Sequence, residues 1–145
     1  MLPMLRKEKM ETRKLYNIAK EEGITVDFFT LPEAKGLSLL VAGKRFIALD
    51  KGAVCGEATE RVLLAHELGH HTADALYGPE AEDALRKRKE RRADRWAIER
   101  LVPYGELLDA IKQGDETVPF LADRFGVTED FMQKALKFYY ENKSA

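Results

Sequence analysis

The stretch His66-Glu67-Leu68-Gly69-His70 contains the pattern H-E-x-x-H, and it decides how the rest of the chain is interpreted. Histidines four residues apart project from one face of an α-helix, so both rings can reach one metal ion at about 2.1 Å. A glutamate directly after the first histidine lies one step around the helix, where it can act as a general base. The pattern therefore predicts a helix that binds zinc and supports hydrolysis.

A metal-free helix with two buried, hydrogen-bonded histidines is the alternative. The chain has three histidines, and His66, His70 and His71 all lie within six consecutive positions. The preceding residues 62–65 are apolar, which indicates that the helix is buried. Buried polar groups without partners cost about 1–3 kcal/mol each. A shared metal ion would satisfy both imidazoles and the carboxylate of Glu67, so we favour the metal site.

The third metal ligand has to come from another segment, because catalytic zinc usually has three protein ligands. Ala73 and Leu76 stand where a metzincin has its glycine and last histidine, which excludes that class. Residues 80–101 lack glycine and proline and predict a helix. Glu90 and Asp94 lie four residues apart on its apolar face. We therefore predict Glu90 as the third ligand and Asp94 as the acid that orients a zinc histidine.

Alternatives to this ligand set stay open at the level of sequence. Glu90 and Asp94 could form a structural carboxylate pair bridged to nearby arginines. The reserve candidates for the third ligand lie in or near the loop after the zinc helix and are Asp74, Glu80, Glu82 and Asp83. Cys55 precedes that helix, but a single cysteine without a partner motif is more often a small buried apolar residue.

The residues around both blocks resemble a known family. The run 61–70, Arg-Val-Leu-Leu-Ala-His-Glu-Leu-Gly-His, is followed by Glu90-x-x-Ala93-Asp94-x-Trp96-Ala97 and by Leu101-Val102-Pro103. This arrangement is similar to the ImmA/IrrE family of small zinc metallopeptidases, in which a Glu-x-x-Ala-Asn/Asp segment supplies the third ligand. Trp96 replaces the usual phenylalanine, and no metal or catalytic position departs from the family pattern. The motifs cover about residues 47–103.

The resemblance implies a regulatory zinc endopeptidase. It implies a Zn²⁺ ion at His66, His70 and Glu90, with Glu67 as the catalytic general base. Family members commonly act on helix-turn-helix repressors of mobile elements or stress genes, so the implied partner is such a repressor. Two rivals stay open: a metal-binding regulator that sequesters a transcription factor without cleavage, and a DNA-binding regulator that uses the C-terminal helices.

Length and composition predict a compact intracellular protein. The chain has 145 residues, a net charge of -1 and 34% charged residues, which indicates no overall nucleic-acid or membrane bias. A single cysteine cannot form an internal disulfide, which fits a reducing cytoplasm. Residues 1–9 lack the apolar core of a signal peptide, and no run approaches the ~20 apolar residues of a membrane span. We expect a cytoplasmic protein.

Periodicity and turn residues predict an α+β fold with a zincin-like core. We expect helices over residues 11–22, 57–71, 80–101, 104–113, 120–125 and 129–141, strands over 24–29, 37–42 and 45–49, and a loop over 52–56. The second and third strands form a hairpin across Gly43 and Lys44. The three-stranded sheet is expected to pack on the zinc helix and the ligand helix.

We divide the chain into a catalytic domain, residues 1–114, and a C-terminal helical appendage, residues 115–145, packed on it. Residues 121–128 resemble the first half of a helix-turn-helix. The next helix begins Thr128-Glu129-Asp130, with acids where DNA phosphates would lie, so we expect packing or protein docking and no direct nucleic-acid binding. The basic run 86–92 is interpreted as a solvated helix face that could dock an acidic partner.

Two further expectations concern the substrate. An edge strand of the small sheet could hold an extended peptide through backbone hydrogen bonds. A hydrolytic site also needs a donor to the carbonyl oxygen that becomes negative during attack. The candidates for that donor are His71, Tyr77 and Tyr104, and the sequence does not choose among them.

Overall fold

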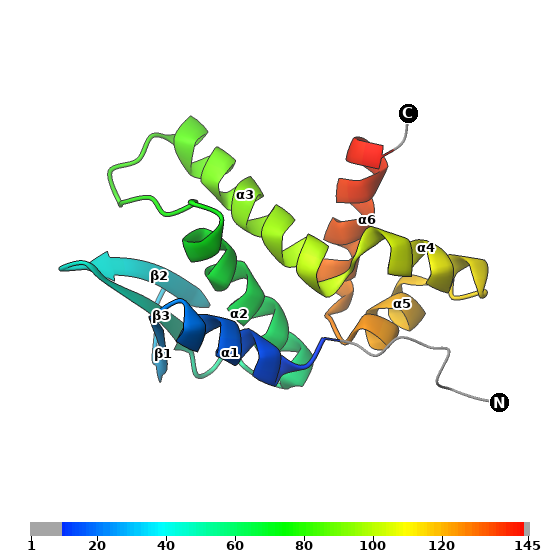
Figure 1. Ribbon diagram of the computed structural model, residues 1–145, viewed down its shortest axis with the longest axis horizontal. Coiled ribbons are helices and arrows are strands. Elements are labelled where there is room, and N and C mark those ends of the chain that lie inside the picture. Colours follow the sequence, from blue (N-terminus) through cyan, green and yellow to red (C-terminus); the bar gives the residue numbers. More distant parts are fainter. Residues whose placement is uncertain (1–9, 144–145) are drawn as a thin grey trace.

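The computed structural model describes residues 10–143 and confirms the α+β class. Its elements follow one another as α1 (Thr12–Glu21), β1 (Ile24–Phe29), β2 (Gly36–Val41), β3 (Lys44–Asp50), α2 (Glu57–Thr72), α3 (Asp83–Leu101), α4 (Tyr104–Lys112), α5 (Val118–Phe125) and α6 (Glu129–Lys143). Figure 1 shows their arrangement. Residues 1–9, for which we predicted no targeting role, and residues 144–145 lie outside the described residues. None of the described helices has the length and hydropathy that crossing a bilayer requires.

The sheet has the strand order β1-β3-β2, so β2 is an edge strand. β1 runs parallel to the central strand β3, and β2 runs antiparallel to it. The β2–β3 hairpin turns through Ala42 and Gly43, which have φ angles of 51° and 77°. Two consecutive left-handed residues are what a tight type I′ turn requires. The predicted turn at Gly43 and Lys44 was therefore one residue late, because the sequence analysis counted Ala42 as part of the strand.

The sheet packs on α1 and α2, as Figure 1 shows. Ile47 and Leu49 of β3 are buried in one core with Leu64 and Leu68 of α2. We expected the sheet to pack on both ligand-bearing helices. Only α2 has that position, and α3 packs on the other side of α2 (Figure 1). Helix α2 is therefore the central element, and its burial, predicted from apolar residues on several faces, is confirmed.

A glycine allows α2 and α3 to approach each other closely. A Cβ atom at Gly69 would lie 2.6 Å from the backbone oxygen of Ala93 on α3. Real Cβ atoms do not come that close to a neighbouring oxygen, so any larger residue would push the helices apart. The short distance between the two backbones matters for function, because α2 and α3 carry the predicted metal ligands.

The C-terminal helices follow the predicted order. α5 ends at Gly126, which has a φ angle of 68°, and α6 begins after Thr128, whose hydroxyl accepts a hydrogen bond from the backbone N–H of Phe131 at 3.2 Å. The hydroxyl of Tyr139 on α6 donates to the backbone oxygen of Val102 at 2.7 Å. This hydrogen bond attaches α6 to Val102, the residue that follows α3. The division of the chain at residue 114 stays a prediction.

Candidate metal centre

Three side chains from α2 and α3 converge on one point. Nε2 of His66 lies 2.9 Å from Oε1 of Glu90, and Nε2 of His70 lies 3.2 Å from Oε2 of the same carboxylate. The two Nε2 atoms are 3.2 Å apart. One nitrogen or oxygen from each residue lies within 4.8 Å of the others, so this group could hold a metal ion. The histidines and the glutamate that the sequence analysis singled out are thus brought together.

The outer nitrogens of both histidines are hydrogen-bonded to acceptors. Nδ1 of His66 lies 2.8 Å from Oδ1 of Asp94, and Nδ1 of His70 lies 2.7 Å from the backbone oxygen of Ala75. Because a carboxylate and a carbonyl oxygen only accept, each Nδ1 carries the hydrogen. In the neutral imidazoles each Nε2 is then an acceptor, and both lone pairs are directed at the same point as the carboxylate of Glu90. Three converging acceptors fit a divalent cation.

The pKa shifts of these groups point to the same preference for positive charge. Burial lowers the pKa of His66, but the protonated ring donates from Nδ1 to Asp94 and from Nε2 to Glu90, and these hydrogen bonds outweigh burial and raise the pKa to about 10. Burial also lowers the pKa of His70, and the hydrogen bond to Glu90 raises it above its ordinary value. Hydrogen bonds with both histidines hold the pKa of Glu90 well below its usual range. The electrostatic field that favours protons here also favours a metal ion.

Glu67 lies beside this cluster and is nearly inaccessible, with 6% of its surface exposed. The hydroxyl of Ser38 on β2 lies 2.8 Å from its Oε1 atom. The β2 backbone also passes close to this carboxylate, since a Cβ atom at Gly36 would lie 2.9 Å from Oε2 of Glu67. Burial raises the pKa of Glu67, which is the direction that suits a group that both accepts and releases a proton near neutral pH.

Tyr77 lies in the loop between α2 and α3. Of the candidate hydrogen-bond donors to the substrate's carbonyl oxygen, it is the one that reaches the cluster. Its hydroxyl donates to Oε2 of Glu90 at 2.5 Å. Burial and this hydrogen bond raise the pKa of Tyr77 to about 12. The guanidinium carbon of Arg86 lies 5.3 Å from the centre of the Tyr77 ring. The phenol therefore keeps its proton at neutral pH and can donate it in a hydrogen bond.

The other two candidate donors lie elsewhere. The Nε2 atom of His71 is 3.1 Å from the backbone oxygen of Phe46, so this ring is bound to the sheet. The ring of Tyr104 packs on that of Tyr139 with their centres 5.1 Å apart, among the C-terminal helices. Among the candidates that the sequence left open, the geometry therefore selects Tyr77.

The cluster opens into a cleft of about 730 Å³, a size typical of substrate sites. One wall is the edge strand β2 with the preceding loop, and Gly36, Ser38 and Leu39 contribute to it. The opposite wall is formed by the loop residues 76–79 and by the first half of α3. The three converging side chains and Glu67 form part of its lining, so the cluster is accessible to a substrate.

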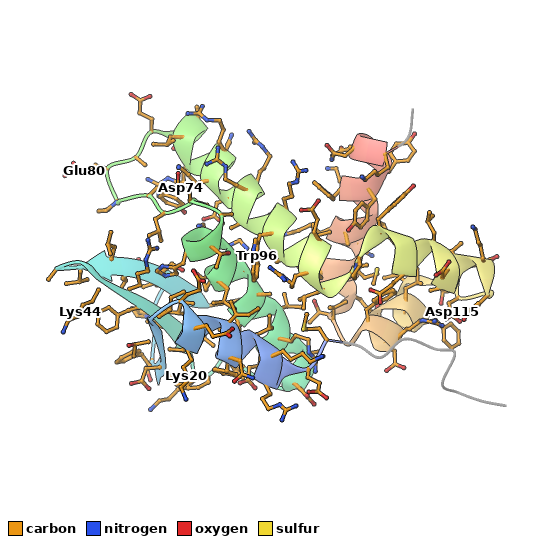
Figure 2. All side chains as sticks on the ribbon, viewed as in Figure 1. Lys20, Lys44, Asp74, Glu80, Trp96 and Asp115 are labelled. Carbon is orange, nitrogen blue, oxygen red and sulfur yellow. The ribbon has the colours of Figure 1, made fainter. Side chains whose placement is uncertain are left out.

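The reserve ligands and the cysteine are not part of the cluster. Within the described residues, the alternative third ligands neither line the cleft nor belong to the group that could hold a metal ion. These alternatives are Asp74, Glu80, Glu82 and Asp83. Figure 2 labels Asp74 and Glu80 along this loop. Cys55 is exposed, with its Sγ atom 3.7 Å from the hydroxyl of Thr59, so the prediction that it is buried was wrong.

Sequence analysis missed Ser38, Gly36 and the position of Arg86. Ser38 is a polar residue among apolar ones in the strand Gly-Leu-Ser-Leu-Leu-Val, and that break in the pattern was an available signal. Gly36 and Arg86 offered no such signal, because their roles depend on Glu67 and Tyr77, which lie on other elements.

An α+β fold in which an H-E-x-x-H helix meets a glutamate of the next helix has a zincin-like architecture. The chain belongs to the peptidase M78 family: the family model described as the IrrE N-terminal-like domain matches residues 19–137. The resemblance to the ImmA/IrrE family is thereby confirmed. None of the curated proteins matches the chain.

A solved structure with a similar fold is a Mycobacterium tuberculosis transcriptional regulator. The two chains superpose with a TM-score of 0.63 at 18% sequence identity, over 83% of this chain and 38% of that one. This chain thus spans little more than a third of the regulator's length. At this identity the likeness concerns the fold alone.

Proposed function

We propose that the chain is a zinc-dependent endopeptidase whose metal is held by His66, His70 and Glu90. The observation that carries the proposal is the convergence of three acceptors beside the buried carboxylate of Glu67, in a cleft of substrate size. Membership of the peptidase M78 family supports a metallopeptidase. Two histidines and one glutamate form a ligand set of catalytic zinc. When bound, zinc supplies a Lewis acid that polarises the scissile carbonyl and activates water.

Glu67 serves as the general base of this proposal. It accepts a proton from the attacking water and then transfers it to the departing amine nitrogen, so that one carboxylate acts twice. The hydroxyl of Ser38, 2.8 Å from Oε1, restricts the rotation of the carboxylate and keeps it directed along the cleft. The burial that raises the pKa of Glu67 makes its protonated form accessible for the second step.

Two further residues position the reacting groups. Tyr77 donates a hydrogen bond to the carbonyl oxygen as that oxygen becomes negative, exchanging its contact with Glu90 for the substrate. Asp94 accepts the Nδ1 hydrogen of His66 and so fixes the tautomer in which Nε2 is free to bind metal.

A protein substrate is proposed to bind as an extended strand along β2. β2 is an edge strand, and its residues Gly36 to Leu39 line the cleft. A peptide paired with its free backbone groups would pass beside Glu67 and the cluster, with affinity that depends little on sequence. The family and the regulator of similar fold support a regulatory role. We extend the proposal to cleavage, in the cytoplasm, of a helix-turn-helix repressor of a mobile element or stress response.

The test incubates the zinc-loaded protein with the repressor encoded next to its gene and identifies fragments by mass spectrometry. We expect fragments that a chelator abolishes. The Glu67→Gln variant should keep its zinc and lose cleavage by about 10²–10⁴-fold, as expected for removal of a general base. Glu21→Gln, an exposed change on α1, is the matched control and should cleave normally. Unchanged cleavage by Glu67→Gln would exclude the proposed base.

The alternative function is a metal-binding regulator that sequesters a transcription factor without cutting it. The similar fold of a transcriptional regulator is the observation that supports this alternative. It predicts a stable complex with the repressor, lost on chelation, from which no fragments appear and in which Glu67→Gln behaves as wild type. A DNA-binding regulator using α5 and α6 would instead bind a duplex in a salt-sensitive manner without any need for zinc.

A further inference from the structure

A second concave surface, the α3–α6 groove, lies between helices α3 and α6. It has a volume of about 470 Å³. Its basic lining consists of Arg88, Arg91, Arg92 and Arg95 of α3 with Lys134 and Lys137 of α6. Figure 1 shows that these helices lie close together near the C-terminal end of α3 and diverge from there. Two acids also line the groove, yet the chain as a whole has a net charge of -1, so positive charge is concentrated here.

Several of these cations form no ion pair with a carboxylate of the described residues. Within residues 10–143, no acidic side chain lies within ion-pair distance of Arg88, Arg91 or Lys137. Lys134 contacts Asp94 at 3.4 Å, and Arg95 pairs with Glu99 at 3.4 Å. Arginines four residues apart on one helix face repel each other. The groove therefore favours a ligand that brings negative charge.

The floor of the groove is apolar, so a ligand that also carries an apolar group fits it better than one that carries only negative charge. Ile98 is 1% exposed, and Phe138 is half-buried. Asp94 and Glu141 are also part of the lining and would repel a continuous row of phosphates. A nucleic-acid backbone offers phosphates at regular spacing and no aliphatic group for the floor. A protein segment can offer carboxylates and an apolar side chain together.

We propose that the α3–α6 groove docks an acidic segment of a partner protein. Its carboxylates pair with the arginines and lysines of both walls, and an apolar side chain contacts the accessible part of Phe138. The groove adjoins the outer side of the metal centre, because Asp94 lines it and is also hydrogen-bonded to His66. A partner docked there is therefore held next to the cleft. The binding itself does not depend on the proposed cleavage.

The test measures the affinity of a fluorescent peptide of about 12 glutamate and leucine residues for the zinc-loaded Glu67→Gln protein, by anisotropy. A peptide with lysine in place of glutamate is the control ligand. In the same background, Arg91→Glu combined with Lys137→Glu should weaken binding about tenfold or more, because two attractive contacts become repulsive. Raising the salt from about 0.05 M to about 0.5 M should weaken it in the wild-type groove as well.

The matched control reverses Lys14 and Lys20, two exposed lysines of α1, to glutamate. Figure 2 labels Lys20 on that helix, beside the sheet. This variant has the same net charge as the groove variant and should bind the acidic peptide within about twofold of the parent protein. Thermal unfolding and zinc content establish that both variants are folded.

Three outcomes would overturn the proposal. The first is that the parent protein leaves the acidic peptide unbound at millimolar concentration. The two charge-reversal variants could lose affinity equally, in which case net charge alone explains the binding. A DNA duplex could bind more tightly than the peptide and lose that binding in the groove variant, which would make the groove a nucleic-acid surface. Failure of the cleavage test with intact peptide binding would refute the proposed endopeptidase and leave the groove in place.

Discussion

The cleft and the α3–α6 groove use neighbouring faces of one helix and have opposite chemistry. Glu90 and Asp94 are turned toward α2, where they meet the histidines. Arg91 and Arg95, each one residue later and therefore about 100° further around the helix, line the groove. In the cleft acceptors converge on a point, and in the groove donors are spread over two walls. A rotation of one residue therefore leads from the face proposed to hold a metal ion to the face proposed to bind an acidic segment, and Asp94 borders both.

Burial explains why side chains are held in fixed directions at one surface and are free to reorient at the other. The side chains of the cluster, His66, Glu67, His70 and Glu90, are partly or fully buried, and each has a hydrogen-bond partner that fixes its direction, as Asp94 does for His66. The cations of the groove are exposed and keep most of their hydration, so they tolerate the absence of partners. The charges in the cleft are positioned in advance, whereas those in the groove are available to a ligand.

The largest effect is expected from Glu90→Ala. Without the third acceptor the two imidazoles should lose zinc, and with it all cleavage, whereas the exposed change Glu99→Ala on the same helix should keep both. The zinc content after dialysis, measured by mass spectrometry, decides the outcome. A Glu90→Ala protein with a full complement of zinc would show that the convergence of these side chains is not a metal site. His66→Ala and His70→Ala should behave like Glu90→Ala.

Tyr77→Phe should lower kcat by about 10²-fold, because it removes a donor to the developing negative charge. The zinc content and KM should change little. Tyr104→Phe is the matched control, since that ring packs among the C-terminal helices. Steady-state kinetics on the cleaved substrate separates the two variants. Equal rates for Tyr77→Phe and wild type would assign the phenol a structural role beside Glu90.

Asp94→Asn should weaken zinc binding by about 10–100-fold while the ligands stay in place. The amide is a weaker acceptor for the Nδ1 hydrogen of His66, so the imidazole becomes a poorer donor to metal. Competition with a chromophoric chelator gives the dissociation constant. Because Asp94 also contacts Lys134, the acidic peptide should bind the groove at least as tightly in this variant. An unchanged zinc affinity would remove Asp94 from the metal centre.

The effect of Gly69→Ala is expected on stability, because this variant changes the spacing between α2 and α3. The added methyl group would meet the backbone oxygen of Ala93 at 2.6 Å and force the helices apart. We expect the free energy of unfolding to fall by about 1–3 kcal/mol, as overpacking typically causes. Gly105→Ala, with open space around the new Cβ atom, should be neutral or slightly stabilising. Urea titration measures both, and equal stabilities would mean that the helices adjust freely.

Local patterns in the sequence predicted much of the fold and of the candidate site. The spacing of His66 and His70, and that of Glu90 and Asp94, is a property of any α-helix, so both pairs were expected on one face before the structure was known. The alternation of β1 gave its bounds, Ile24–Phe29. One error came where a residue broke its usual preference: the left-handed backbone of Ala42 moved the hairpin turn.

These local patterns did not predict the contacts between different helices and strands. Nothing local to Ser38 or Tyr77 says that the first meets Glu67 or that the second meets Glu90. The same holds for the concentration of cations in the groove, because half of its walls come from a helix about 40 residues further along the chain. The sequence predicted a basic face on α3, and the packing of α6 turned it into a groove.

By itself the sequence determined which side chains share a helix face, because that relation depends only on the rise and rotation of the backbone. The tertiary structure decided which faces meet and at what distance, and Gly69 is the clearest case. Its missing side chain lets α3 approach α2 until Glu90 lies within 3 Å of His66. That distance depends on how two surfaces pack, and packing involves the volumes of residues far apart in the chain.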